Sequence, residues 1–250
     1  MKDQQQVLDF TMAAGRTLLE NGAEVFRVQQ TMEIIARSYG AQKVSGYVLT
    51  NGIFFSIEDL DTKVVYVKEA GVHLGRVAAV NELSREIAAG RVPLAEAYAR
   101  LERAAALPPT PKWGVVLACA GGSASFTWLF GGCLWDGVCS LAVGAMLQLF
   151  LLAAERVRFN KIFTKLVGAG LVAALALALP CPDMDSVIIG SLMPLTPGIA
   201  FTMAIRDFIN ADYLSGTIRL IDALLIAGSI ACGVGLVLAA ANNWLGVAFL

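Results

Sequence analysis

Five apolar segments in residues 113–250 constrain the fold of this chain more than any other feature. They lie at 114–132, 137–154, 162–180, 187–205 and 219–240, so each has 18 to 22 residues. A helix needs about 17–25 mostly apolar residues to cross a hydrocarbon core about 30 Å thick. The sequence therefore predicts a membrane protein with an all-α bundle of five transmembrane helices.

Charged residues separate this part from the rest of the chain. Residues 1–112 hold 13 of the 19 Lys and Arg and 13 of the 20 Asp and Glu, which leaves 6 and 7 for residues 113–250. We therefore expect a soluble domain at 1–112 and a transmembrane domain at 113–250. The first twenty residues lack the apolar core of a cleavable signal peptide, so the soluble domain is expected to stay in the cytoplasm.

Apolar periodicity predicts an α+β fold for the soluble domain. The 3.6-residue period gives way to alternation around residue 43 and returns near residue 75, and Asn51-Gly52 is a typical hairpin turn. A second turn is expected at Asp59-Leu60-Asp61. The predicted order is ααβββαα, with helices at 5–20 and 23–39, strands at 43–50, 52–58 and 63–69, and helices at 75–90 and 93–106.

The soluble domain shows no pattern typical of a catalytic or metal site. Glu24 and Arg27 lie three residues apart on the second helix, which fits either a surface ion pair or a contact with a partner or regulator. His73 is the only histidine and is expected in a solvated loop. All five cysteines lie in 113–250 without a C-x-x-C pair, and we interpret them as small apolar residues. No metal, cofactor or nucleic acid is expected, and the chain is predicted not to be an enzyme.

Basic residues cluster at alternate ends of the predicted spans. The other ends, at 131–136, 180–186 and 241–250, contain no Lys or Arg. By the positive-inside rule, the N-terminus is cytoplasmic and the C-terminus is outside. The basic positions are Arg100, Arg103, Lys112, Arg156, Arg158, Lys161, Lys165, Arg206 and Arg219.

The fourth predicted span contains a P-x-x-P-G motif formed by Pro194, Pro197 and Gly198. At 1.5 Å per residue, Pro194 lies about 12 Å deep and Gly198 about 18 Å, on either side of a midplane at about 15 Å. A proline inside an undisturbed helix costs roughly 3 kcal/mol, and the backbone groups that it frees must meet protein or water. The helix is therefore expected to break near the centre of the membrane.

The residues around the break favour a new helix start. Thr196 fits an N-cap and Pro197 the first helical position, followed by a half-helix to about residue 208. Its first N–H groups, on Gly198, Ile199 and Ala200, would attract a carboxylate. The alternative is a proline kink whose backbone groups are satisfied by neighbouring helices.

Other polar and small residues lie at membrane depth or at its boundary. Ser123, within GGSAS of the first span, either bonds to its own backbone or lines a cavity. Arg206, Asp207, Arg219 and Asp222 stand at the cytoplasmic boundary, as anchors or internal pairs. Small residues at four-residue spacing, Ser140/Gly144 and Ala227/Ala231/Gly235, permit close helix packing, which we expect to occur within this chain.

Taken together, these motifs resemble the bacterial threonine/serine exporter family over nearly the whole chain. The similar segments are GAEVFRVQQTMEIIARSYG, FGGCLWDG, PLTPGIAFTMAIRDFINADYLSG and RLIDALLIAG. The resemblance implies a cytoplasmic domain followed by a helical membrane bundle, and export of small carboxylate metabolites across the bacterial inner membrane. It places the family motif on Pro194, Pro197, Gly198, Arg206, Asp207, Asp212 and Gly216.

The chain is similar to the longer subunit of a two-component exporter. That type implies a smaller membrane subunit as partner, and succinate as well as threonine or serine as substrate. The leading hypothesis is a transporter subunit whose substrate-binding residues are Thr196, Pro197, Gly198, Ile199, Ala200, Ser123 and Arg206. Asp207, Asp212, Gly216, Arg219, Asp222, Glu24 and Arg27 are assigned gating or structural roles. The alternative is a membrane-anchored sensor, regulator or scaffold with its activity in residues 1–112.

Overall fold

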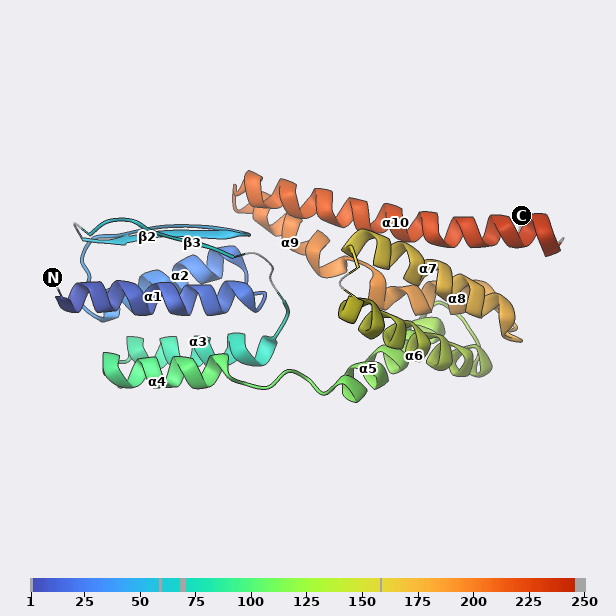
Figure 1. The fold of residues 1–250 in the computed structure, drawn as a ribbon, viewed down its shortest axis with the longest axis horizontal. Helices are drawn as coiled ribbons and strands as arrows, with labels where there is room; N and C mark the ends of the chain where they lie inside the picture. The colour runs from blue at the N-terminus through green and yellow to red at the C-terminus, as the bar shows by residue number, and fades with distance from the viewer. Residues whose placement is uncertain (1, 59, 68–70, 158, 246–250) are drawn as a thin grey trace. The chain divides into compact units, whose positions relative to one another are not determined.

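The computed structural model describes residues 2–58, 60–67, 71–157 and 159–245. The chain divides into two compact units, Met1–Pro109 and Thr110–Leu250, and each is described by itself (Figure 1). Residues 59, 68–69 and 158, which belong to the predicted second turn, the predicted third strand and the predicted basic boundary, lie outside the described residues.

The first unit has the predicted ααβββαα order. Its three strands form one antiparallel sheet in the order β1-β2-β3, in which Val48 pairs with Ile53 and Phe54 with Val64. The elements are α1 (Lys2–Glu20), α2 (Val25–Ser38), β1 (Val44–Leu49), β2 (Gly52–Ile57), β3 (Lys63–Tyr66), α3 (Leu74–Ala88) and α4 (Leu94–Ala105). Pro93 lies just before α4 as its N-cap, because its fixed φ and missing N–H suit a helix start.

The core of the first unit lies where α1 meets one face of the sheet, α2, α3 and α4. Phe10 of α1 is fully buried, and its ring makes edge contacts with Tyr39 and Tyr98. Both tyrosine hydroxyls donate to backbone carbonyls, Tyr39 to Val92 and Tyr98 to Gln6. Burial raises the pKa of Tyr39 and Tyr98, so both remain protonated donors at neutral pH.

The second unit is entirely helical in its described part. Its elements are α5 (Lys112–Leu129), α6 (Leu134–Val157), α7 (Lys161–Ala178), α8 (Met184–Leu192), the 3₁₀ turn η1 (Met193–Leu195), α9 (Gly198–Ile209) and α10 (Tyr213–Leu245). Among the described residues, α6, α7 and α10 are long and apolar enough to cross a membrane, and α8–η1 with α9 makes a bent fourth candidate. Helix α5, the first predicted span, is not among them, because Lys112 and the GGSAS segment lower its mean hydropathy. The count of five spans therefore stays a prediction.

Helices of the second unit approach one another at glycines. A Cβ on Gly190 of α8 would lie 2.1 Å from Thr127 Oγ1 of α5, and one on Gly233 of α10 would lie 2.1 Å from the carbonyl oxygen of Leu166 on α7. Between α5 and α6, Thr127 and Ser140 share a buried hydrogen bond of 2.6 Å. These contacts require small residues, which is the usual way that membrane helices pack closely.

One predicted stripe of small residues packs differently from what we expected. Ser140 and Gly144 do meet α5, but Ala227, Ala231 and Gly235 of α10 are exposed, and a Cβ on Gly235 would meet no described atom within 4 Å. The expectation of intrachain packing was wrong for this stripe, because α7 packs on the adjacent face of α10 through Gly233.

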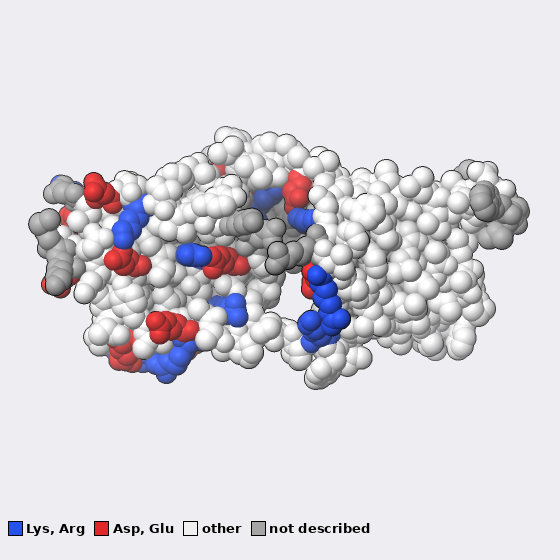
Figure 2. All heavy atoms as spheres, viewed as in Figure 1, with Lys and Arg blue, Asp and Glu red and all other residues white. Residues whose placement is uncertain are grey.

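In the view of Figure 2, charged side chains are spread over the first unit, whereas most of the second is uncharged.

Candidate functional site

The predicted break lies between α8 and α9, whose axes differ in direction by 58°. Helix α8 ends at Leu192, the 3₁₀ turn covers Met193–Leu195, and α9 begins at Gly198. Pro194 and Pro197 have no N–H to donate, so the ladder of hydrogen bonds is interrupted here. The structure satisfies the carbonyl of Met193 in another way, because Thr196 donates to it from both its N–H (3.1 Å) and its hydroxyl (2.7 Å).

The expected role of Thr196 as N-cap was wrong. Pro197 is the N-cap of α9, with φ −84° and ψ 45°, and among the described residues no side-chain hydrogen bond caps this helix start. The hydroxyl of Thr196 points back to Met193, whose carbonyl would otherwise have lost its helical donor. The hydroxyl of Thr196 thus belongs to the preceding turn, and α9 starts one residue later than the sequence pattern suggested.

The start of α9 leaves three backbone N–H groups ahead of its hydrogen-bond ladder. The first intrahelical bond runs from the N–H of Phe201 to the carbonyl of Pro197 (3.0 Å), so the N–H groups of Gly198, Ile199 and Ala200 precede it. Gly198 is exposed, and a Cβ there would meet no described atom within 4 Å. These groups carry the partial positive charge of a helix N-terminus and are open to a ligand.

Ser123 is the predicted site residue that lies on α5. Its side chain is fully buried between α5 and α6, and its hydroxyl lies 2.4 Å from where a Cβ of Gly144 would be. Ser123 is therefore a residue of the α5–α6 contact in this conformation. The sequence left open whether Ser123 bonds to its own backbone or lines a cavity. Because Gly144 has no side chain, α6 comes close enough to α5 to bury Ser123.

The family motif downstream of the break forms the hairpin between α9 and α10. Arg219 Nε lies 3.1 Å from Asp207 Oδ2, in a pair whose side chains are 22% and 10% exposed. Asp212 accepts from the N–H of Ser215 through Oδ1, which caps the start of α10. A Cβ on Gly216 would lie 2.8 Å from the ring of Phe208, so this glycine allows α10 to lie against α9. The motif residues thus hold α9 in place.

The remaining predicted residues take part in other contacts, each within its own unit. Half-buried Arg206 is in the last turn of α9, at the opposite end from Gly198. Asp222 of α10 pairs with Lys161 of α7 at 2.7 Å. In the other unit, Arg27 Nε lies 3.4 Å from Glu24 Oε2, and the side chains are 62% and 28% exposed. His73 is the N-cap of α3 and contacts the carbonyl of Pro108 (3.0 Å), so it is not simply solvated.

Asp136 has a structural role that the sequence did not reveal. Its fully buried carboxylate accepts from the N–H of Cys133 (2.8 Å) and from that of Asp183 (3.1 Å). Asp183 in turn caps α8 through Ser186. One carboxylate thereby joins the α5–α6 and α7–α8 connections. The only signal was its position in FGGCLWDG, since pairing with residue 183 requires the tertiary fold.

Two comparisons with known proteins point to the same family over nearly the whole chain. The model of the threonine/serine exporter (ThrE) family matches residues 9–241. A Mycobacterium tuberculosis (strain ATCC 25618 / H37Rv) protein named "Probable threonine/serine exporter" is 23% identical over 248 residues, which cover 96% of this chain and 47% of that protein. The chain thus spans about half the length of this curated relative. No solved structure matches it significantly.

Proposed function

The chain belongs to the threonine/serine exporter family, and on that premise we propose that it is a subunit of a secondary transporter that exports small carboxylate metabolites from the cytoplasm. Family membership and its apolar helices make it a membrane protein and favour transport over catalysis. Secondary transporters commonly bind substrate at discontinuous helices, where half-helix N-termini face anionic groups.

The observation that carries the proposal is the exposed helix start after Pro197. The N–H groups of Gly198, Ile199 and Ala200 bind the substrate carboxylate, with Pro194 and Pro197 maintaining the break. The exposed hydroxyl of Thr196 retains lone pairs that can accept from the substrate. Ser123 is left out of this site because its hydroxyl is buried.

The far end of α9 attracts the substrate and couples the site to α10. Arg206, one helix length from Gly198, provides positive charge at the cytoplasmic mouth. The Asp207–Arg219 pair and the Gly216 contact make α9 and α10 move as one body during alternating access. In this proposal the protein lies in the bacterial inner membrane, with its N-terminus in the cytoplasm and its C-terminus outside.

A smaller membrane subunit of the same family is the proposed partner. The segments quoted from the sequence resemble the longer subunit of a two-component exporter, which supports a partner of this kind. The exposed stripe Ala227/Ala231/Gly235 on α10 suits close contact with another membrane helix. A divided transporter of this kind handles threonine and serine or a dicarboxylate such as succinate.

The test is efflux from cells preloaded with labelled threonine, serine or succinate. Gly198→Trp should abolish efflux without preventing membrane insertion, because a Cβ there meets open space and the indole would cover the N–H groups. Ile209→Trp is the control, since Ile209 is 78% exposed at the other end of the same helix. Normal efflux by an inserted Gly198→Trp protein would refute the assigned site.

A further inference from the structure

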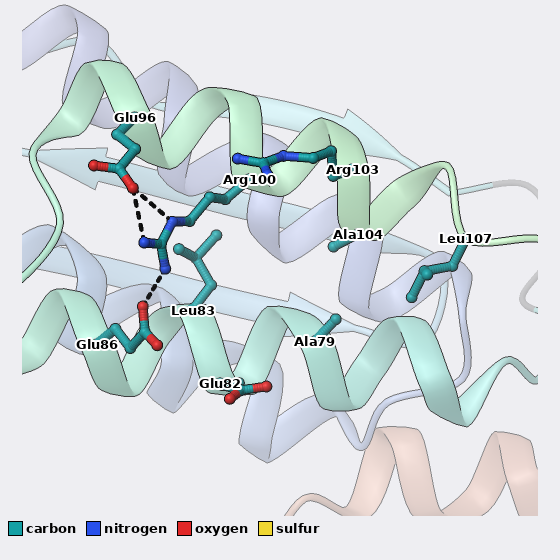
Figure 3. Close-up of a pocket in the computed structure, with 9 residues that line it drawn as sticks. All are labelled: Ala79, Glu82, Leu83, Glu86, Glu96, Arg100, Arg103, Ala104 and Leu107. Carbon is teal, nitrogen blue, oxygen red and sulfur yellow. Dashed lines mark hydrogen bonds and ion pairs between the residues drawn. The ribbon is translucent and has the colours of Figure 1, made fainter.

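A groove runs between α3 and α4 in the first unit. Its volume is about 470 Å³, within the roughly 300–1,000 Å³ of typical small-molecule sites. Figure 3 shows the two helices and the side chains that line the groove, with Arg100 extending from α4 toward Glu86 of α3. The lining residues are Ala79, Glu82, Leu83, Glu86, Glu96, Arg100, Arg103, Ala104 and Leu107.

Helical spacing and the short connection determine which groups face each other. Residues 79, 82, 83 and 86 share one face of α3, and residues 96, 100, 103 and 104 share one face of α4, with Leu107 just beyond its end. A short loop joins the helices, so they run antiparallel. With Glu86 opposite Arg100, Glu82 lies one turn along at the level of Arg103.

One end of the groove is already closed by ion pairs. Arg100 reaches across to Glu86 and also contacts Glu96, at 2.9 Å from Nε and 2.7 Å from Nη2 (Figure 3). The hydrogen bond to Glu96 is the main cause that raises the pKa of Arg100. Arg100, Glu86 and Glu96 therefore pair with one another at this end of the groove, and we assign them a structural role.

The other end of the groove holds the charged side chains of Glu82 and Arg103, which are not part of these ion pairs. Arg103 donates from Nε to the carbonyl of Ala99 on its own helix (3.2 Å). Within the described residues, neither Arg103 nor Glu82 forms an ion pair, although they stand on opposite walls at the same level. The floor around them is apolar, formed by Ala79, Leu83 and Ala104.

We propose that this groove binds a small zwitterion, a free α-amino acid with a short side chain. Glu82 takes the ammonium group, Arg103 takes the carboxylate, and the apolar floor accommodates the side chain. The lining carries three carboxylates and two guanidinium groups, so a dicarboxylate is disfavoured there. The proposal goes beyond export and does not depend on it, because a domain that senses amino acids fits a transporter or a regulator.

The test is calorimetric titration of the full-length protein in detergent micelles with L-threonine and with succinate as probes. The Gly198→Trp substitution is present throughout, so that the helix start after Pro197 does not contribute. Threonine should bind saturably, and Glu82→Gln and Arg103→Gln should each weaken binding at least tenfold. Glu102→Gln is the matched control, because Glu102 is exposed on α4 outside the groove.

The expected result includes succinate binding at least tenfold more weakly than threonine. The proposal is overturned if threonine does not bind, if both groove variants bind it as the parent does, or if succinate binds equally well. Neither Glu82 nor Arg103 forms an ion pair in the described structure, so their substitution should not unfold the domain. Unchanged thermal unfolding of the two variants will confirm that they fold. Efflux is measured separately, so a failure of the groove and a failure of the export proposal are distinguishable.

Discussion

Large side chains fill the interior of Met1–Pro109, whereas helices of Thr110–Leu250 meet through glycine, serine and alanine. Phe10 and Phe55 are fully buried in the first unit. In the second, Leu147 and Leu195 are also buried, but Leu129 and Leu236 are mostly exposed, and the closest helix contacts involve Gly190 and Gly233. Water drives large apolar groups inward, but lipid does not, so membrane helices associate through close packing of small residues.

The largest expected effect is a loss of core volume in the first unit. Phe10→Ala should lower the free energy of unfolding of this unit by about 3–5 kcal/mol, because it removes a fully buried ring and leaves a cavity. Hydrogen exchange of the full-length protein during denaturant titration measures this in residues 1–109. Phe26→Ala, at a 56% exposed position, should change it by less than about 0.5 kcal/mol. Equal effects would contradict the described core.

The second unit should respond most to added volume. Gly190→Ala should destabilise it by about 3 kcal/mol, because the new Cβ meets backbone atoms of Thr127 that cannot move aside. Gly198→Ala, eight residues along the same broken span, should change stability by less than about 0.5 kcal/mol. Thermal unfolding in detergent compares the two variants. A tolerated Gly190→Ala would show that α5 and α8 are not in close contact.

Ion pairs within the second unit should differ according to their burial. Asp207→Asn should lower stability by about 1–2 kcal/mol, because Arg219 is only 22% exposed and would lose its anionic partner. Asp222→Asn removes a pair whose side chains are 60% and 44% exposed, so its effect should stay below about 1 kcal/mol. The same thermal unfolding assay measures both. The reverse ranking would show that the α9–α10 hairpin is held by other contacts.

The smallest expected effect is an acid sensitivity confined to the first unit. Glu58 accepts hydrogen bonds from the N–H groups of Gln42 and Lys43, and the bond from Gln42 is the main cause that lowers its pKa below the ordinary 4.5. Its contribution is therefore present above pH 4.5 and is lost as the pH falls through the lowered value. Glu58→Gln should remove this part of the pH profile of unfolding. An unchanged profile would contradict the assigned role.

Local patterns were sufficient for the elements of the first unit and for the position of the break. Changes of period located the helices and strands to within a few residues in the described part. Pro194, Pro197 and Gly198 predicted a half-helix from 197 to 208, and α9 is Gly198–Ile209. The exact start was missed because the hydroxyl of Thr196 bonds to Met193 instead of capping α9. Whether this hydroxyl donates to the preceding carbonyl or accepts from an N–H of the next helix depends on torsions that the residue pattern does not encode.

The sequence by itself determined the division into a charged and an apolar part, the order of elements and the interrupted helix. These follow from composition, periodicity and proline, which act over a few residues. Only the tertiary structure decided that Ser123 is buried, that Ala227, Ala231 and Gly235 are exposed, and that Asp136 joins two connections. A small or polar residue has the same local preferences on either face of a helix, so the neighbouring helix decides its role.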